Sequence, residues 1–179
     1  MKEALLLVDL QNDYFPGGKM ELVGSDQAAY NAALLLESFR GKKRTIIHVQ
    51  HISLGEGSSF FVPQTEGVKI HSKVAPQHGE LVISKHFPNS FRETELLQTI
   101  QNNEIEHLVV CGAMSHMCID ATVRAAFDFG LQCTVVHDGC ATRDLTFEGK
   151  VVGAEEVHAG YMAALAAVYA KVVSTSQIV

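Results

Sequence analysis

The chain has 179 residues, of which 47% are hydrophobic, a length that fits one domain with a substantial core. Lys and Arg total 14 against 20 Asp and Glu, and the net charge of −6 comes without a basic block that would follow a phosphate backbone. No apolar run has the length of a membrane span. We therefore expect a single domain over residues 1–179, with no nucleic-acid or membrane partner.

The cysteines and the amino terminus indicate where the protein works. The four cysteines, Cys111, Cys118, Cys133 and Cys140, form no CxxC pair and are too few for a disulfide scaffold in a chain of this length. The first ten residues contain only a short apolar run, which Asp9 interrupts, unlike a secretory signal. These features predict reduced thiols in a cytoplasmic protein.

The first half of the chain alternates between strand-like and helical patterns. Residues 4–8 form a continuous apolar run, which predicts a strand covered on both faces. Helical spacing of apolar residues begins at Ser25, the expected N-cap, and ends at Gly41. A strand is expected over 45–50. The stretch 53–79, rich in Gly, Ser, Pro and His, is the longest irregular segment, and loops of this size are usually functional or mobile.

The second half continues the alternation. The pattern predicts strands at 80–84, 107–111, 132–137 and 171–174, and helices at 93–102, 116–129 and 148–169, with Gly130 closing the second of these helices. Strands separated by helices of this length imply right-handed crossovers. The fold class is therefore α/β, a three-layer, doubly wound, mainly parallel six-stranded sheet with helices on both faces.

Three strand-like runs end in or lead to a reactive side chain. Asp9 follows the first run, Lys85 follows the third, and a turn after the fourth leads to Cys118. In a parallel sheet the carboxyl ends of all strands lie along one edge, so an acid, a base and a thiol placed there can meet in one crevice. This grouping suggests a hydrolase with a cysteine nucleophile.

Cys118 is the candidate nucleophile. Ser115 is a good N-cap, which would place Cys118 in the first helical turn, where unpaired N–H groups and the helix dipole favour negative charge. A thiol there is expected to ionise readily, and the thiolate is the attacking species. The alternative is a small buried hydrophobic residue, as most free cysteines are. The other three cysteines lie within strands or in a loop without an obvious acid or base.

Asp9 and Lys85 are the candidate partners of this thiol. A carboxylate directly after five apolar residues is costly to bury unless it is paired, and Lys85 leaves the end of another strand and could supply the cation. Together they could move a proton from the thiol to a leaving group. The alternative is a structural ion pair without chemistry.

The residues around these positions resemble the signatures of the isochorismatase-like cysteine hydrolases. The resemblance rests on AspLeuGlnAsnAspTyrPhe at 9–15, SerLysHis at 84–86, the segment from GlyAlaMetSerHisMetCys to Gly at 112–130, and HisAspGlyCysAla at 137–141. It runs from Leu5 to about Ser174, and the segment at 112–130 is its most specific part. It implies an Asp–Lys–Cys triad of Asp9, Lys85 and Cys118.

The resemblance also implies features of the nucleophile turn. The family carries a cis peptide just before this turn, here expected at Ala113–Met114. The backbone N–H groups of Met114 and Cys118 are then implied as the oxyanion hole. Family likeness further points to homo-oligomers.

Differences among the branches of this family narrow the expectation. Nicotinamidases bind a metal through an Asp-x-His pair after the second strand, whereas this chain has Val49 two residues before His51. We therefore expect no metal and no cofactor, although His48 and His51 could still coordinate by themselves. In addition, residues 61–77 resemble the loop of the isochorismatase-like branch more than that of nicotinamidases.

Several side chains are placed, by position and by likeness, to surround a small planar substrate. They are Tyr14, Phe15, His51, Phe91 and His116. Each could instead be a packing residue. The 53–79 loop could complete the pocket, in this subunit or in a neighbouring one.

Three functions remain open. The first is amide-type C–N hydrolysis of a small molecule through a Cys118 thioester. The second is cleavage of a vinyl ether with Asp9 as general acid, as in the siderophore-synthesis branch, whose members often lack the cysteine. The third is a thiol sensor without enzymatic activity. The presence of Cys118 favours the first, and the absence of a Gly-x-Gly-x-x-Gly segment after the first strand excludes a dinucleotide-binding fold.

The expected helix at 154–170 bears on assembly. After its first turn it is apolar on nearly every face, so it must be covered by its own core or by another subunit. One face can pack on the sheet, while the other would expose a patch that monomers rarely tolerate. We expect a homodimer or larger homo-oligomer, with this helix or the 53–79 loop in the interface.

Overall fold

The computed structural model describes all residues from Met1 to Val179 and contains one six-stranded sheet. All five strand pairings in this sheet are parallel, in the order β3-β2-β1-β4-β5-β8. The strands are β1 (Glu3–Val8), β2 (Thr45–His51), β3 (Leu81–Lys85), β4 (His107–Ala113), β5 (Gln132–Ala141) and β8 (Lys171–Val173). The predicted doubly wound fold is confirmed.

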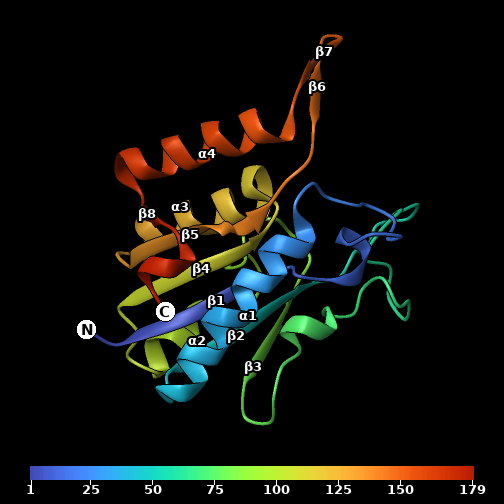
Figure 1. Cartoon of the computed structure of the whole chain (residues 1–179). Coiled ribbons are helices and arrows are strands. Elements are labelled where there is room, and N and C mark those ends of the chain that lie inside the picture. Colours follow the sequence, from blue (N-terminus) through green and yellow to red (C-terminus); the bar gives the residue numbers. More distant parts are fainter.

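Four α-helices cover the two faces of the sheet (Figure 1). They are α1 (Ser25–Gly41), α2 (Leu96–Asn102), α3 (Asp120–Asp128) and α4 (Ala154–Val168). Alternate residues of β1 face opposite sides, because strand side chains alternate. Leu5 and Leu7 pack with α1, while Leu6 and Val8 pack with α2, α3 and α4. The result is a three-layer arrangement with a separate apolar core on each face of the sheet, and a third apolar cluster includes Tyr14 and Phe61.

A glycine sets the contact between β1 and β4 at their carboxyl ends. Gly112 pairs with Val8 in the register of the two strands and has a φ of +130°, a conformation that other residues rarely adopt. A Cβ atom at this position would lie 2.0 Å from the Val8 carbonyl oxygen. Any side chain here would therefore push the two strands apart, directly before Asp9 and the turn that follows β4.

Residues 145–152 form a hairpin, so the prediction of a helix over 148–169 is wrong at its start. The strands β6 (Leu145–Phe147) and β7 (Lys150–Val152) pair antiparallel, and α4 begins only at Ala154. Glu148 and Gly149 between them have φ values of +49° and +78°, as a tight two-residue hairpin turn requires. Figure 1 shows this hairpin standing out from the rest of the chain, beyond the end of α4.

Smaller differences concern helix starts. Helix α1 begins at Ser25, but Gly24, with a φ of +77°, holds the cap position and no side chain caps the helix. Helix α2 begins at Leu96 rather than at Glu93, whose φ of +55° is not helical. The predicted end at Gly130 is confirmed by its φ of +83°.

The loop between β2 and β3 is tied to the segment that follows β1. Asp13 is buried, and its Oδ2 accepts a hydrogen bond of 2.6 Å from the backbone of Phe61. Gln11 forms a β-bridge with Ile70 in the same loop. Two loops thus meet over the carboxyl edge of the sheet. Elsewhere in the chain, none of the helices combines the length and apolar character needed to span a membrane.

Candidate active site

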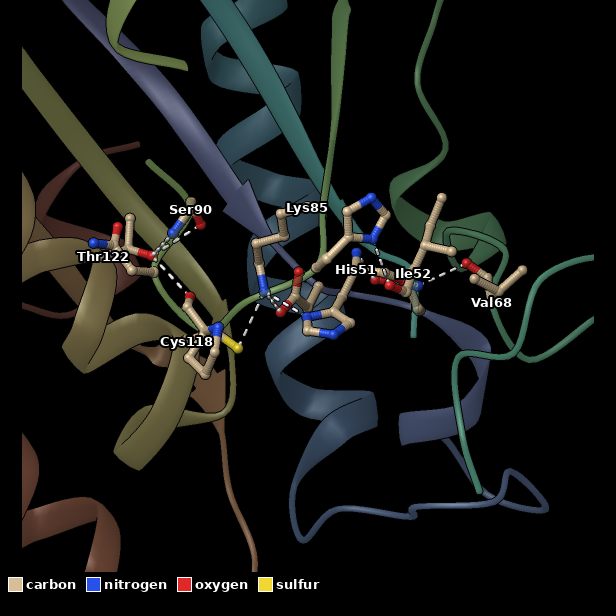
Figure 2. Close-up of polar contacts among 12 residues, drawn as sticks. His51, Ile52, Val68, Lys85, Ser90, Cys118 and Thr122 are labelled. Atoms are coloured by element: carbon tan, nitrogen blue, oxygen red, sulfur yellow. Dashed lines mark hydrogen bonds and ion pairs between the residues drawn. The ribbon is translucent and has the colours of Figure 1, made fainter. Parts of the chain in front are cut away.

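Four neighbouring strands deliver the side chains that meet at the carboxyl edge of the sheet. Asp9 follows β1 directly, and Cys118 lies in the turn after β4. His51 and Lys85 are the last residues of β2 and β3 and pair with each other. Figure 2 shows Lys85 between Cys118 and His51. The structure therefore brings together the three residues singled out in the sequence and places His51 among them.

The ammonium of Lys85 is the centre of the site. Its Nζ lies 2.7 Å from Asp9 Oδ2, 2.8 Å from His51 Nδ1 and 3.2 Å from Cys118 Sγ. Burial by itself lowers the pKa of Lys85, but the Asp9 carboxylate and the Cys118 sulfur outweigh burial and raise this pKa above its ordinary value. Lys85 therefore stays charged, with one ion-pair partner and two hydrogen-bond partners around its ammonium.

The carboxylate of Asp9 is fully buried and is held by one ion pair. Neither of its oxygens accepts a hydrogen bond besides the close approach of Lys85 to Oδ2. A buried carboxylate is stable only with such a partner. One Asp9 oxygen also lies within 4.8 Å of Cys118 Sγ. The carboxylate therefore has free acceptor capacity beside the thiol.

The thiol of Cys118 is less acidic than its position in the sequence predicts. Its residue is only 5% exposed, and burial raises the pKa of the thiol. The Asp9 carboxylate raises this pKa further, and the Lys85 ammonium lowers it without reversing the shift. The prediction of a readily ionised thiol is therefore wrong for the resting site, because burial and the Asp9 carboxylate outweigh the Lys85 ammonium. Cys118 keeps its proton until a reaction removes it.

The turn that carries Cys118 is π-helical, spans Ser115–Ile119 and continues into α3. The prediction of Ser115 as the N-cap is wrong, since Met114 holds the cap position and no side chain caps the turn. The Ser115 hydroxyl is buried and instead lies 3.3 Å from the Ala141 carbonyl and 2.8 Å from His158 Nδ1. Its contacts with β5 and α4 keep it away from the N–H groups of the turn.

The peptide bond between Ala113 and Met114 is cis, as the family resemblance predicts. The Met114 carbonyl accepts hydrogen bonds from the N–H groups of Met117 and Ile119, at 3.0 and 3.2 Å. The N–H groups of Met114 and Cys118 donate none of the loop hydrogen bonds in this turn. These two groups remain the candidates for stabilising negative charge on a substrate oxygen.

Gln11 belongs to the site although the sequence gave no reason to single it out. It is fully buried two residues after Asp9. Its Oε1 accepts a hydrogen bond of 2.7 Å from the His51 N–H, and its Nε2 donates to the His51 carbonyl at 2.8 Å. The same Nε2 donates to the Val68 carbonyl at 2.7 Å. The only sign in the sequence that could have pointed to Gln11 is its polar side chain just beyond a buried strand.

Tyr14, predicted as a pocket residue, is buried in the segment that follows β1. Burial raises the pKa of its phenol, and the Asp9 carboxylate raises it further. Its ring packs on Phe61 at 4.5 Å between centroids, and Phe61 also lies 5.9 Å from the His51 ring. Phe61 comes from the long loop, and no sequence pattern indicated it.

The other predicted pocket residues have varied surroundings. The ring of Phe15 stacks on His71 at 3.8 Å between centroids. Phe91 belongs to the same apolar cluster as Cys118. His116 Nδ1 lies 2.6 Å from Thr142 Oγ1. The first two are buried, so they form walls or packing around the site, whereas His116 is partly exposed.

The donor set does not fit a metal ion. Ligand atoms of Asp9, His51 and Cys118 lie within 4.8 Å of one another, but the Lys85 ammonium already contacts all three. A cation there would have to displace a buried positive charge. Val49 packs in the core, and His48 is committed to Glu80 at 2.9 Å.

A doubly wound sheet with an acid, an ammonium and a thiol at its carboxyl edge has the layout of an α/β enzyme. A family model for the isochorismatase domain matches residues 3–177. YddQ, an isochorismatase family protein of Bacillus subtilis (strain 168), is 54% identical over 175 residues, which are 98% of this chain and 97% of that protein. The chain therefore belongs to the isochorismatase family and is a hydrolase of that family.

Two further similarities agree with this assignment. The crystal structure of an isochorismatase from Pseudomonas putida KT2440 matches with a TM-score of 0.93 at 40% identity, covering 99% of this chain and 90% of that one. Streptothricin hydrolase from Streptomyces noursei is 31% identical over 143 residues, which are 80% of this chain and 56% of that enzyme.

Proposed function

We propose that the protein is a cysteine hydrolase that cleaves an amide-type C–N bond of a small molecule, with Asp9, Lys85 and Cys118 as its catalytic triad. The observation that carries this proposal is the Lys85 ammonium, 2.7 Å from the Asp9 carboxylate and 3.2 Å from the Cys118 sulfur in a buried site. A thiol, a proton acceptor and a fixed positive charge are the groups that acyl transfer to sulfur requires.

In the first half-reaction, Asp9 accepts the thiol proton while the Cys118 sulfur attacks the carbonyl carbon. A C–S bond forms, and the carbonyl π pair moves onto the oxygen, where the N–H groups of Met114 and Cys118 stabilise the negative charge. The oxyanion then collapses and the C–N bond breaks. The nitrogen takes the proton from Asp9 and leaves as ammonia or an amine.

In the second half-reaction, water hydrolyses the thioester. Asp9 accepts a proton from the water as its oxygen attacks the acyl carbon, and the C–S bond breaks. The released sulfur of Cys118 takes the proton back from Asp9. Lys85 stays protonated throughout and stabilises the thiolate and the carboxylate in turn. Amide and water are thereby converted to acid and ammonia or an amine.

The raised pKa of the Cys118 thiol fits this order of events. The resting site holds a neutral thiol beside the ion pair of Asp9 and Lys85, so proton transfer and attack occur together only when a carbonyl is present. A bystander thiol, as vinyl-ether cleavage would imply, needs no contact with an ammonium. A thiol sensor needs a readily ionised sulfur, whereas the pKa of the Cys118 thiol is raised.

We propose Tyr14, Phe15, His51, Phe91 and His116 as the walls of the substrate pocket, with Phe61 added from the long loop. Aromatic walls favour a small planar substrate. We also propose that the protein works in the cytoplasm, since its four cysteines are unpaired and a nucleophilic thiol must stay reduced.

A screen for ammonia release from acetamide, benzamide, nicotinamide and N-carbamoylglycine tests this function. Replacing the nucleophile in Cys118→Ala should reduce turnover on the order of 10⁴–10⁶-fold, and Cys118→Ser should also be weak. Cys133→Ala, at a buried strand cysteine outside the site, is the matched control and should retain activity. Near wild-type turnover by Cys118→Ala would falsify the proposal.

A further inference from the structure

His51 is placed in the site by contacts that the reaction steps above do not use. It ends β2 and pairs in register with Lys85 at the end of β3. Its backbone is held by Gln11 on one side, and its ring contacts the Lys85 ammonium on the other. This continuous chain of contacts joins the segment after β1 to the charged centre of the site.

Gln11 bonds to both polar backbone groups of His51. Both the N–H and the carbonyl of His51 bond to the one side-chain amide of Gln11, which mimics the pairing of a further strand. The same amide reaches the Val68 carbonyl in the long loop. Because Gln11 is fully buried, these bonds are not shared with bulk solvent. The backbone of His51 is thereby held in one position beside Lys85.

The contact with the ring completes the surroundings of the ammonium. Lys85 Nζ has three close partners, an ion pair with Asp9 and hydrogen bonds with Cys118 and His51. His51 Nδ1 accepts one of the ammonium protons, and this fits a ring whose pKa is lowered to about 4 by burial and by the nearby ammonium. Without this acceptor one donor would be buried and unpaired, and the ammonium would be free to turn away from the sulfur.

We propose that His51 and Gln11 are positioning residues, Gln11 by fixing the backbone of His51, and His51 by holding the Lys85 ammonium against Asp9 and Cys118. This role rests on the proposed function, because it acts through the catalytic lysine. His51 touches the ammonium and not the reacting carbonyl.

Alkylation of Cys118 by iodoacetamide, followed by peptide mass spectrometry, tests the role of His51 without a substrate. His51→Ala should slow alkylation at about pH 8 by roughly tenfold to a hundredfold, the scale of one charge-assisted hydrogen bond. His51→Asn should restore the rate to within about threefold, since its Oδ1 can accept in place of Nδ1. On the amide hydrolysed fastest in the screen, His51→Ala should lower kcat by the same factor, whatever the loss of its ring from the pocket wall does to KM.

Matched controls separate positioning from a general loss of structure. His48 lies on the same strand and is more deeply buried than His51, but its ring contacts Glu80. His48→Ala should therefore leave the alkylation rate unchanged, whatever it does to the urea midpoint.

A second pair isolates Gln11. Gln50 also donates to the Val68 carbonyl, at 2.8 Å, but does not hold His51. Gln11→Leu should slow alkylation of Cys118, whereas Gln50→Leu should not.

The outcomes are distinguishable from those of the proposed function. Unchanged alkylation and kcat in His51→Ala, together with inactive Cys118→Ala, would overturn the positioning role and leave the function standing. Active Cys118→Ala would remove the function, while the alkylation rates would still report on His51. A zinc-dependent rise in kcat that His51→Asn abolishes would assign His51 to a metal and also overturn the role.

Discussion

The carboxyl edge of the sheet and the β6–β7 hairpin with α4 differ in how well one chain covers and pairs their side chains. At the edge, the fully buried ammonium of Lys85 has one ion-pair partner and two hydrogen-bond partners. The hairpin instead carries Phe147 with 73% of its surface exposed and Val151 with 62% exposed. The comparison teaches that the charged groups of the site find their partners within one chain. The apolar side chains of the hairpin and of the outer face of α4 stay exposed in one chain.

The apolar surface beside the hairpin is continuous with α4. A groove of about 390 Å³ lies between them, lined by Leu145, Phe147, Val152, Glu156, Val157, Gly160, Tyr161 and Ala164. From Val157 to Ala170 the chain carries no acidic or basic residue other than His158, although Val168 is 62% exposed. We propose that a second copy of the chain covers this surface, as the pattern of α4 predicts.

The largest expected effect comes from removing the buried ammonium at the carboxyl edge of the sheet. Lys85→Met should abolish activity and lower the unfolding free energy by about 3–5 kcal/mol, since it leaves the Asp9 carboxylate buried and unpaired. Urea denaturation measures this loss. The double variant Asp9→Asn, Lys85→Met should recover most of the stability and none of the activity.

The exposed pair of Lys73 and Asp26, at 2.8 Å, provides the control for this experiment. Lys73→Met should change the unfolding free energy by no more than about 1 kcal/mol, because an exposed ion pair is well solvated. Equal losses in Lys73→Met and Lys85→Met would contradict the central role of the buried ammonium.

The second prediction tests whether a second copy of the chain covers the hairpin and α4. Light scattering of the wild type at micromolar concentration should give at least twice the 19.5 kDa mass of one chain. Phe147→Asp and Ala164→Asp should shift this mass towards the monomer, because each buries a charge in the proposed interface. Tyr30→Asp, on the exposed side of α1, should leave the mass unchanged. A monomeric wild type would refute the proposed assembly.

A smaller effect concerns how the free energy of unfolding depends on pH through His51. The pKa of His51 is about 4 in the folded chain and near its ordinary value of 6.5 when unfolded, so the ring is neutral in both states above pH 6.5. Between these values the unfolded chain binds a proton that the folded chain does not, and the unfolding free energy falls as the pH drops.

His51→Asn should remove this dependence. From pH 7 to about pH 4.5 the wild type should lose up to about 2–3 kcal/mol more than the variant, and less where solvent reaches the ring. Urea denaturation at both pH values measures the difference. The other buried histidines are present in both proteins and cancel, so equal losses would show that His51 is not held neutral by its surroundings.

The smallest expected effect is none. Dialysis against EDTA should leave both turnover and the alkylation rate of Cys118 unchanged, because the Lys85 ammonium takes the place among Asp9, His51 and Cys118 that a cation would need. Loss of activity that zinc or iron restores would show that the histidines were misjudged.

Much of the fold could be predicted because the buried strands are continuously apolar and are separated by helical patterns. The hairpin was missed because the apolar residues on either side of Glu148 and Gly149 were merged with the pattern of α4. Its two-residue turn was the available signal, since both residues adopt a positive φ. A helical period extended through Gly149 and Gly153 should have raised the alternative of a turn.

The site was predictable only where chemistry follows directly from strand ends. The positions of Asp9, Lys85 and Cys118 follow from the parallel sheet, and the structure brings them together. The pKa of the Cys118 thiol does not follow, because it depends on burial by residues far away in the chain. Gln11 reaches residues 40 and 57 positions away, contacts that no local pattern encodes.

Gly112 limits the distance between the Asp9 carboxylate and the Cys118 thiol. Asp9 and the turn of Cys118 leave neighbouring strands directly after the point where Gly112 lies against Val8. The spacing of two backbones, with nothing between them, therefore fixes how far apart the two reactive groups can lie. A methyl group at this position would force the two strands apart and lengthen the path of the proton between Asp9 and Cys118.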